Sequence, residues 1–279
     1  MDTKFINTTY IPYVMSNKHL GFHDVDIDYG FTYLTSSDDP SIDITTKLSQ
    51  NHVLKCPIVY LNQSRYDRIE YFAASKFGCL CIVESKLFES AKHLNDEIAI
   101  LHNAGVNIGF TIGINPDDVN IIDTVLTSNP TLKNPVVFIN SEYGDSQSTI
   151  EQIRKVALKF GKSITIMAGS INTPIGIQKA IIAGATIITT NCDYAVTTTL
   201  NLHRTIFGMT SNIKLISYQS NASILQNPAK ALIAGADALI TRDSTNIDNI
   251  IKTIRGVMYH TNCRTIHDLF NTGMFIERI

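Results

Sequence analysis

Short apolar runs alternate along the chain with longer stretches whose apolar residues recur at helical spacing. The apolar runs cover residues 56–62, 79–85, 107–114, 135–142, 163–170, 186–193, 214–221 and 238–245. Helical periodicity falls between them, at 66–76, 89–104, 116–128, 149–160, 174–183, 228–234 and 247–259. Each interval has room for one strand, one helix and two loops. Eight such units predict a single (β/α)8 TIM barrel, with an open doubly wound sheet as the alternative.

Five glycines mark the places where a helical stretch meets the next apolar run. Two of these junctions are near copies, Lys-Ala-Ile-Ile-Ala-Gly-Ala-Thr at 179–186 and Lys-Ala-Leu-Ile-Ala-Gly-Ala-Asp at 230–237. A glycine just past a helix adopts the left-handed conformation that closes the last turn. We therefore expect positive φ at all five glycines, which are Gly78, Gly105, Gly161, Gly184 and Gly235.

The chain as a whole divides into an N-terminal extension and one barrel domain. Residues 1–50 precede the first predicted strand, and we interpret them as an N-terminal extension that covers the barrel base or reaches a neighbouring subunit. Residues 51–279 hold the barrel together with a C-terminal helical element. No shift in composition marks a second domain, so one domain is expected.

Composition limits the classes of function. The 279 residues are 44% hydrophobic and 17% charged, with a formal net charge of −2. This balance gives no electrostatic reason to expect a nucleic acid or an anionic membrane as partner. The chain has no apolar run of about 20 residues, the length that spans a bilayer, and no secretory leader pattern. We expect a cytoplasmic protein.

The five cysteines are odd in number and lack CxxC spacing. We interpret them as free thiols in a reducing compartment, because buried free cysteine packs like a small hydrophobic residue. A metal site is not expected, since no pair of histidines or cluster of carboxylates accompanies the cysteines at ligand spacing.

Several short motifs, in order along the chain, carry a resemblance to a known family. They are Leu-Gly-Phe-His-Asp-Val at 20–25, Cys-Pro-Ile-Val at 56–59, Ile-Asn-Ser-Glu-Tyr-Gly-Asp-Ser at 139–146, Met-Ala-Gly-Ser at 167–170, Ile-Arg-Gly-Val-Met-Tyr at 254–259, Thr-Ile-His-Asp-Leu at 265–269 and Phe-Ile at 275–276. Together they resemble the IMP dehydrogenase/GMP reductase family over residues 20–279. The resemblance implies a barrel that binds a purine nucleotide and exchanges hydride with a nicotinamide cofactor.

The resemblance also implies a nucleophilic cysteine after the sixth strand, which attacks the purine ring. In this chain Thr197 stands where the family has that cysteine. A threonine hydroxyl has a far higher pKa than a thiol, so it is a poor substitute. Cys192, five residues earlier, is the displaced candidate for the nucleophile.

The phosphate cradle that the family builds from glycine-rich turns is also altered. After the sixth strand the chain has Asn191 and Asp193, and after the eighth it has Arg242, where glycines are implied. Side chains here fill space that the backbone would leave open for phosphate. The turn after the seventh strand reads Ser217, Tyr218, Gln219 and Ser220, with the tyrosine in place of the aspartate that would hold the ribose.

Four carboxylates lie at the predicted carboxyl ends of strands, which form the catalytic rim of such a barrel. They are Glu84, Glu142, Asp193 and Asp243. A new acid/base pair is one interpretation. We favour a solvated polar rim, because no lysine or histidine is expected to join these carboxylates. Among the histidines only His203, followed by Arg204, is a candidate to meet an anion.

The leading hypothesis is a catalytically inactive IMP dehydrogenase/GMP reductase-like barrel that acts as a structural or protein-binding module. Under this hypothesis we expect the protein to bind no cofactor and no metal, and to form a homo-oligomer or bind a protein partner. One alternative is a divergent NADPH-dependent GMP reductase that uses Cys192 or Thr197. The other is a purine-nucleotide sensor without turnover, binding through Arg242, His203 and Arg204.

Overall fold

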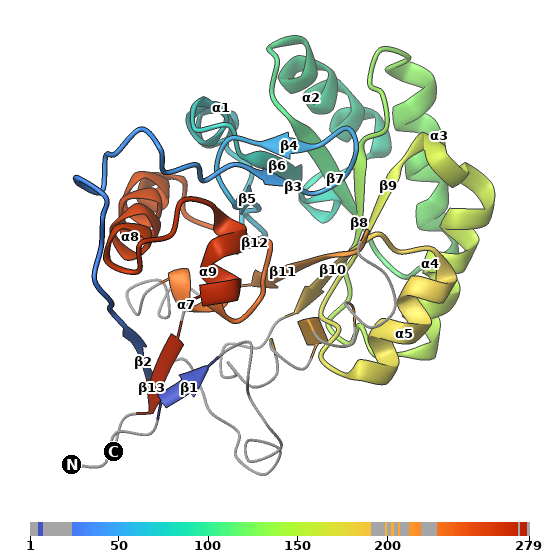
Figure 1. The fold of residues 1–279 in the computed structure, drawn as a ribbon. Helices are drawn as coiled ribbons and strands as arrows, with labels where there is room; N and C mark the ends of the chain where they lie inside the picture. Colours follow the sequence, from blue (N-terminus) through green and yellow to red (C-terminus); the bar gives the residue numbers. More distant parts are fainter. Residues whose placement is uncertain are drawn as a thin grey trace.

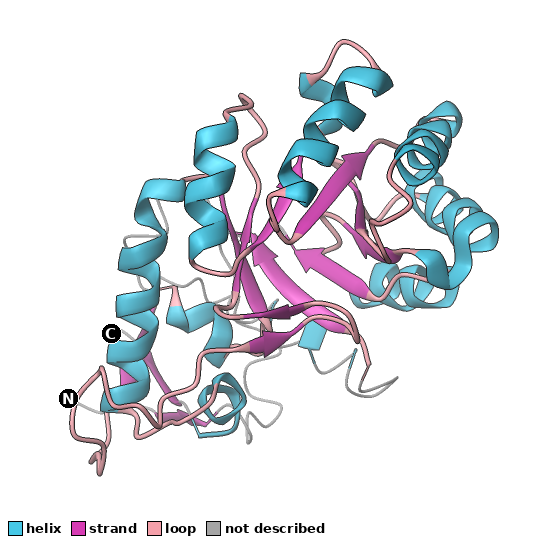
Figure 2. Ribbon diagram, turned by 90° about the horizontal axis from the view of Figure 1, so that it is seen from above, coloured by secondary structure: helices cyan, strands magenta, loops and turns pink. Residues whose placement is uncertain are grey.

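The computed structural model describes residues 5–7, 24–190, 199, 202–203, 206, 212–218, 228–272 and 274–277. At its centre is a closed barrel of eight parallel strands, surrounded by helices (Figures 1 and 2). The barrel strands are β5 (Ile58–Tyr60), β6 (Leu80–Val83), β7 (Ile108–Ile112), β8 (Val136–Ile139), β9 (Thr165–Ala168), β10 (Ile187–Thr190), β11 (Lys214–Tyr218) and β12 (Ala238–Thr241). Each lies within one of the eight predicted runs.

Closure of the sheet distinguishes the two predicted architectures. The last strand, β12, pairs in parallel with the first, β5, so that Leu239 lies opposite Ile58. The prediction of a (β/α)8 barrel is therefore confirmed, and the open doubly wound sheet is wrong. The strands are shorter than the predicted runs, because the polar residues at their carboxyl ends leave the ladder and form the loops of the barrel mouth.

The helices follow the predicted rhythm. They are α1 (Arg68–Lys76), α2 (Ala91–Asn103), α3 (Val119–Ser128), α4 (Gln147–Phe160), α5 (Pro174–Ala183), α7 (Ala229–Ile233), α8 (Ile247–His260) and α9 (Ile266–Thr272). Side-chain caps fix several starts; Thr173, for example, accepts a hydrogen bond from Gly176 N, and Pro174 follows at the first helical position. All five junction glycines have positive φ, from +52° at Gly161 to +114° at Gly184, as predicted.

Two apolar layers hold the barrel together. The inner layer fills the barrel with alternate strand residues such as Ile187, and the outer layer packs residues such as Ile188 against the helices. A small hairpin, β3 (Thr46–Lys47) and β4 (Val53–Leu54), crosses the base. Its side chains Leu48 and Leu54 belong to the inner layer, so the hairpin closes the amino-terminal end of the barrel.

A second sheet lies outside the barrel. It is antiparallel, in the order β1 (Phe5–Asn7), β13 (Met274–Glu277) and β2 (Val25–Asp28). The buried Lys230 of α7 ties this sheet to the barrel, because its ammonium donates a hydrogen bond of 2.5 Å to the carbonyl of Val25. The two ends of the chain thus meet in one sheet beside α7.

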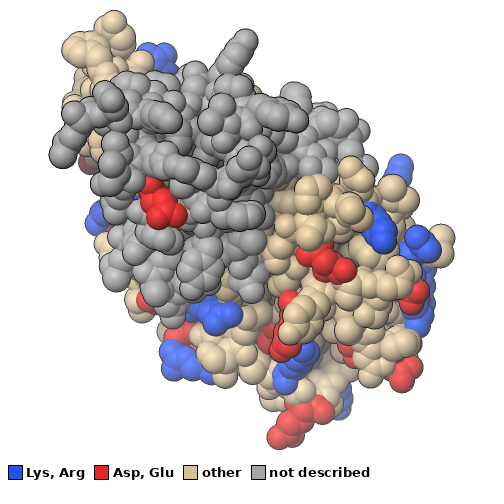
Figure 3. Space-filling view, turned by 90° about the horizontal axis from the view of Figure 1, so that it is seen from below, with Lys and Arg blue, Asp and Glu red and all other residues tan. Residues whose placement is uncertain are grey.

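The described surface is of mixed charge on the face drawn in Figure 3, where acidic and basic side chains lie interspersed. None of the helices in the described ranges is long and apolar enough to cross a bilayer.

Candidate functional site

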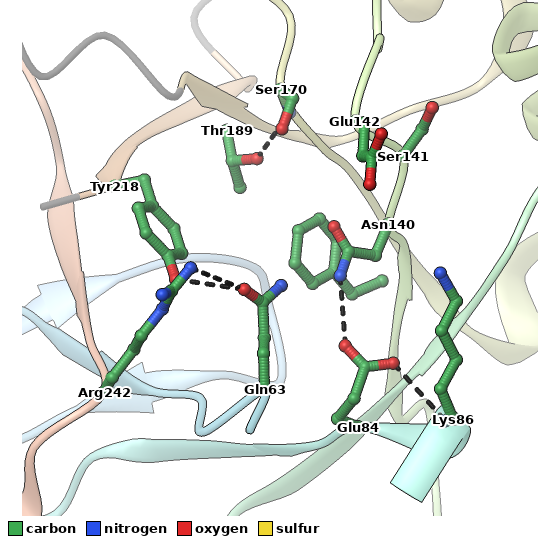
Figure 4. A pocket seen from close by; sticks show the side chains of 11 residues that line it. Gln63, Glu84, Lys86, Asn140, Ser141, Glu142, Ser170, Thr189, Tyr218 and Arg242 are labelled. Atoms are coloured by element: carbon green, nitrogen blue, oxygen red, sulfur yellow. Dashed lines mark hydrogen bonds between the residues drawn. The ribbon is translucent and has the colours of Figure 1, made fainter. Parts of the chain in front are cut away.

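A polar cavity of about 360 Å³ opens at the carboxyl ends of the barrel strands (Figure 4). Loops and strand ends from most of the barrel contribute to it, as expected for the mouth of such a fold. Its lining residues are Gln63, Glu84, Lys86, Phe138, Asn140, Ser141, Glu142, Ser170, Thr189, Tyr218 and Arg242.

Glu84 is the buried charged group of this cavity, with only 3% of its surface exposed. Its carboxylate accepts a hydrogen bond of 2.6 Å from the hydroxyl of Thr111 and one of 3.1 Å from the side-chain amide of Asn140. Thr111 in turn accepts from the backbone N–H of Ser85, 2.9 Å away. Three neighbouring strand ends, β6, β7 and β8, are joined by these bonds, so the carboxylate is fixed in position.

The other two charged side chains on this side of the mouth, Lys86 and Glu142, are exposed. Lys86 extends into the cavity from the short helical turn Ser85–Leu87, and Glu142 lies across from it in the loop after β8 (Figure 4). Both are exposed, and within the described ranges neither side chain has a hydrogen-bond or ion-pair partner. Two expectations are corrected here: a lysine does join the rim carboxylates, and Glu84 is buried and hydrogen-bonded, not solvated.

The opposite side of the mouth is closed by three long side chains. Arg242 donates from Nε to the hydroxyl of Tyr218 and from Nη2 to Gln63 Oε1, 2.7 Å away. The Tyr218 hydroxyl also donates to Gln63 Oε1 over 3.2 Å. The guanidinium lies over the tyrosine ring, which adds a cation–π contact. Strand ends β5, β11 and β12 are thereby bridged across the mouth.

The back of the cavity depends on close backbone packing. The Phe138 ring lies against Gly169, where an added Cβ would come within 2.5 Å of the ring. Ser170 follows in the left-handed region, with φ of +57°, and its N–H donates to the hydroxyl of Thr189. A side chain other than hydrogen in this conformation costs free energy, so the loop after β9 is held in a strained form.

The loop after β8 is fixed to the loop after β9. Asp145 accepts hydrogen bonds from Asn172 N, over 2.8 Å, and from the hydroxyl of Thr173, over 2.6 Å. Gly144 approaches so closely that a Cβ there would meet the Gly169 carbonyl at 2.0 Å. These contacts explain why this motif contains a glycine followed by an aspartate.

Only part of the predicted ligand-binding set lines this cavity. Tyr218 and Arg242 do so and contact each other. Ser217 does not: it is fully buried and faces the outer layer, because Ile216 and Tyr218 on either side of it face inward. The predicted residues Asn191, Cys192, Asp193, Thr197, Arg204, Gln219 and Ser220 lie outside the described residues.

His203 is placed away from the mouth. Its ring packs on Phe270, with centroids 4.1 Å apart, and against Gly235 at the base-side junction before β12. It therefore does not line the mouth cavity, and its contact with an anion stays a prediction. Sequence reasoning also missed Gln63 and Lys86, although each stands within three residues of a strand's carboxyl end, the signal that placed Glu84.

The cysteines in the described part of the chain take no part in the cavity. Cys56, Cys79, Cys81 and Cys263 are buried free thiols, as predicted for these four. Burial raises the pKa of the Cys81 thiol to about 12, which makes its thiolate form rare. No group of three or more potential metal ligands occurs among the described residues.

No protein-family model matches this chain, and a comparison with curated proteins finds no match. The fold thus defines the class, a (β/α)8 barrel with a polar mouth. The likeness to the IMP dehydrogenase/GMP reductase family stays a prediction from the motifs.

Proposed function

We propose that this chain is a catalytically inactive barrel of the IMP dehydrogenase/GMP reductase type, which acts as a structural or protein-binding module. The observation that carries the proposal is the bridge of Tyr218, Arg242 and Gln63 across the mouth. By the motif resemblance, this is the position where the ribose and phosphate of a nucleotide would lie. Side chains that hydrogen-bond to each other now occupy it.

The size of the remaining space supports the same proposal. Ligand pockets usually measure about 300–1,000 Å³. The cavity, at about 360 Å³, is near the lower end of that range. Hydride exchange requires a purine nucleotide and a nicotinamide side by side, and a cavity of this size does not favour both together.

The charges of the mouth give no net attraction for a phosphate dianion. The cavity lining holds two carboxylates, Glu84 and Glu142, against two cations, Lys86 and Arg242. Arg242 already donates from Nε to Tyr218 and from Nη2 to Gln63, so only its remaining N–H groups could meet a phosphate without loss of those bonds. A like charge nearby costs free energy at short range. Buried free thiols fit a reducing compartment, so the proposal includes a cytoplasmic location. An inactive barrel needs no cofactor.

Thermal unfolding with GMP, IMP and NADP(H) tests the proposal. A ligand at about 100 times its Kd stabilises the folded state by about 2.7 kcal/mol, which is readily measured. We expect no shift and no change of absorbance at the nicotinamide band. A shift without turnover would favour the sensor, and a shift with turnover would establish a divergent GMP reductase.

A matched pair of variants sharpens this test. If a nucleotide phosphate binds Arg242, the Arg242→Ala variant loses the ligand-induced shift. The control variant Lys252→Ala removes a cation of α8 that does not line the cavity, so it keeps the shift. If neither the natural protein nor the variants shift, the inactive barrel is supported.

A further inference from the structure

Two segments of the chain carry charge of one sign only. The acidic strip, residues 24–46, contains six aspartates and no lysine or arginine. The basic face, residues 152–190, contains no aspartate or glutamate, and one exposed carboxylate, Glu151, precedes it on α4. Its cations are Arg154, Lys155, Lys159, Lys162 and Lys179, all of them exposed on α4, α5 or the turn after α4.

The same two segments carry most of the exposed large apolar side chains in the described part of the molecule. In the acidic strip Tyr29, Phe31 and Tyr33 are 53%, 79% and 80% exposed. In the basic face Leu158, Ile175 and Ile182 are 82%, 65% and 75% exposed. Only five other large apolar residues are exposed within the described ranges. Clustered apolar groups on a soluble surface mark interaction sites, and aromatic residues are enriched at the centres of interfaces.

The acidic strip is held firmly on the molecule. The Phe31 and Tyr33 rings meet edge to face with centroids 5.1 Å apart. Leu34, just beyond, is buried. Arg255 of α8 donates to three carbonyls of the strip, those of Ser37, Asp39 and Ile42. A surface that is already ordered loses little conformational entropy on binding.

Hydrogen bonds also keep an aspartate of the strip in its ionised form. Hydrogen bonds from the Thr35 backbone and from Ser41 hold the pKa of Asp39 well below its ordinary value. Arg255 and Lys252 of the neighbouring α8, and Lys230, which pairs with Asp26, offset part of the negative charge, but six aspartates outnumber these three cations.

The basic face is built from two helices that lie side by side. Gly184, which ends α5, packs against Ala157 of α4, so Leu158 and Ile182 both lie at the base end of the pair. Next to them is a groove of about 900 Å³ whose lining includes Lys47, Lys162 and Lys214 but no carboxylate; of these cations Lys214 pairs with Asp237. Arg154, Lys162 and Lys179 have no ion-pair partner in the described ranges, whereas Lys159 pairs with Asp123.

We propose that the acidic strip of one copy of this chain docks on the basic face of a second copy. The two surfaces complement each other in charge, and each supplies three exposed apolar anchors. The aromatic part of the strip and the basic face lie on opposite sides of the barrel: the segment after β2 is on the left of Figures 1 and 2, and α4 and α5 are on the right. Contact between opposite sides is head-to-tail, so it builds a ring or a linear assembly rather than an isologous dimer. This inference rests on the proposed binding role and names its partner.

Light scattering on the purified full chain tests the contact. We expect the natural protein to form an oligomer, and its mass to fall when ionic strength rises from about 0.1 M to about 1 M, which shortens the screening length from about 10 Å to about 3 Å. Two double variants remove the anchors, Phe31→Ser with Tyr33→Ser, and Leu158→Ser with Ile182→Ser. Because all four side chains are exposed, both variants should fold, and circular dichroism checks this. Each variant alone should be monomeric, with its dissociation constant raised by about 100-fold or more.

Mixing the two double variants distinguishes a head-to-tail contact from every other arrangement. In an equimolar mixture one intact strip meets one intact basic face, so we expect a heterodimer and no larger species. A monomeric natural protein, an unchanged mass in either variant, or a mixture that stays monomeric would overturn the docking. Those results would leave the nucleotide test untouched, while nucleotide turnover would overturn the proposed function and not the docking.

Discussion

The guanidinium of Arg242 lies over the ring of Tyr218, with its central carbon 4.9 Å from the ring centroid. The two residues come from neighbouring strand ends, and Gln63 from a third accepts hydrogen bonds from both. A cavity mouth that binds a nucleotide needs donors left open to the ligand. Here Nε and Nη2 of Arg242 and the hydroxyl of Tyr218 donate to protein acceptors, so part of the hydrogen-bonding capacity of the mouth is already used within the protein.

Removing Arg242 should destabilise the barrel slightly. We expect Arg242→Ala to lower the free energy of unfolding by about 0.5–1 kcal/mol, the value of an exposed cation–π contact. Tyr218→Phe keeps the ring and loses its hydroxyl bonds, and should cost about 0.5–1.5 kcal/mol. Urea unfolding measures both. Lys86→Ala, at an exposed cation of the same cavity without a partner, is the control; equal stability of Arg242→Ala and this control would refute the bridge.

The buried carboxylate of Glu84 should contribute more to the free energy of unfolding than Arg242 does. Glu84→Ala leaves the hydroxyl of Thr111 and the amide of Asn140 without their acceptor, and we expect a loss of about 1–3 kcal/mol in the free energy of unfolding. Thr111→Val removes the strongest of these bonds, and a double-mutant cycle should give a coupling of about 0.5–3 kcal/mol. Glu142→Gln, at the exposed carboxylate across the cavity, should change stability by less than about 0.5 kcal/mol. No coupling between positions 84 and 111 would contradict the hydrogen bond.

The sequence predicted the barrel because its signals are local. Gly184 and Gly235 reveal the ends of helices, and the apolar runs that follow them can form buried parallel strands without knowledge of any distant residue. The faces of a strand are also readable from the sequence. Alternation along β11 would have assigned Ser217 to the outer layer and Tyr218 to the mouth, had it been applied.

The contacts between loops were not readable. Gln63 and Arg242 are far apart in the chain and meet only because β12 closes on β5. His203 follows β10 in the chain, yet it packs on Phe270 near the base and not at the mouth. Such placements depend on side-chain packing between distant segments, which periodicity does not encode.

Two junction glycines should differ in their tolerance of alanine. At Gly105, with φ of +80°, an added Cβ would meet nothing within 4 Å, so Gly105→Ala should cost only the conformational term of about 1–2 kcal/mol. At Gly184, with φ of +114°, the Cβ would lie 2.6 Å from that of Ala157, which adds about 1–3 kcal/mol of overpacking. Denaturant midpoints measure the difference. In the Gly184→Ala background, Ala157→Gly should recover part of the loss, and an equal cost at both glycines would show that the two helices are not in contact.

The base hairpin should make stability depend on pH through His52. This side chain is 4% exposed, its Nδ1 lies 2.8 Å from the Ser49 hydroxyl, and burial lowers its pKa from 6.5 to about 4. In the unfolded chain the histidine takes up a proton below about pH 6.5, whereas in the folded protein it stays neutral until about pH 4, so stability must fall as the pH falls through this window. We expect a loss of about 2 kcal/mol between about pH 7 and pH 5. Urea unfolding at the two pH values measures it, and His52→Gln should remove that part of the dependence while other groups keep theirs. If the natural protein and the variant lose equal stability, His52 is protonated in the folded state and the hairpin does not seal the base.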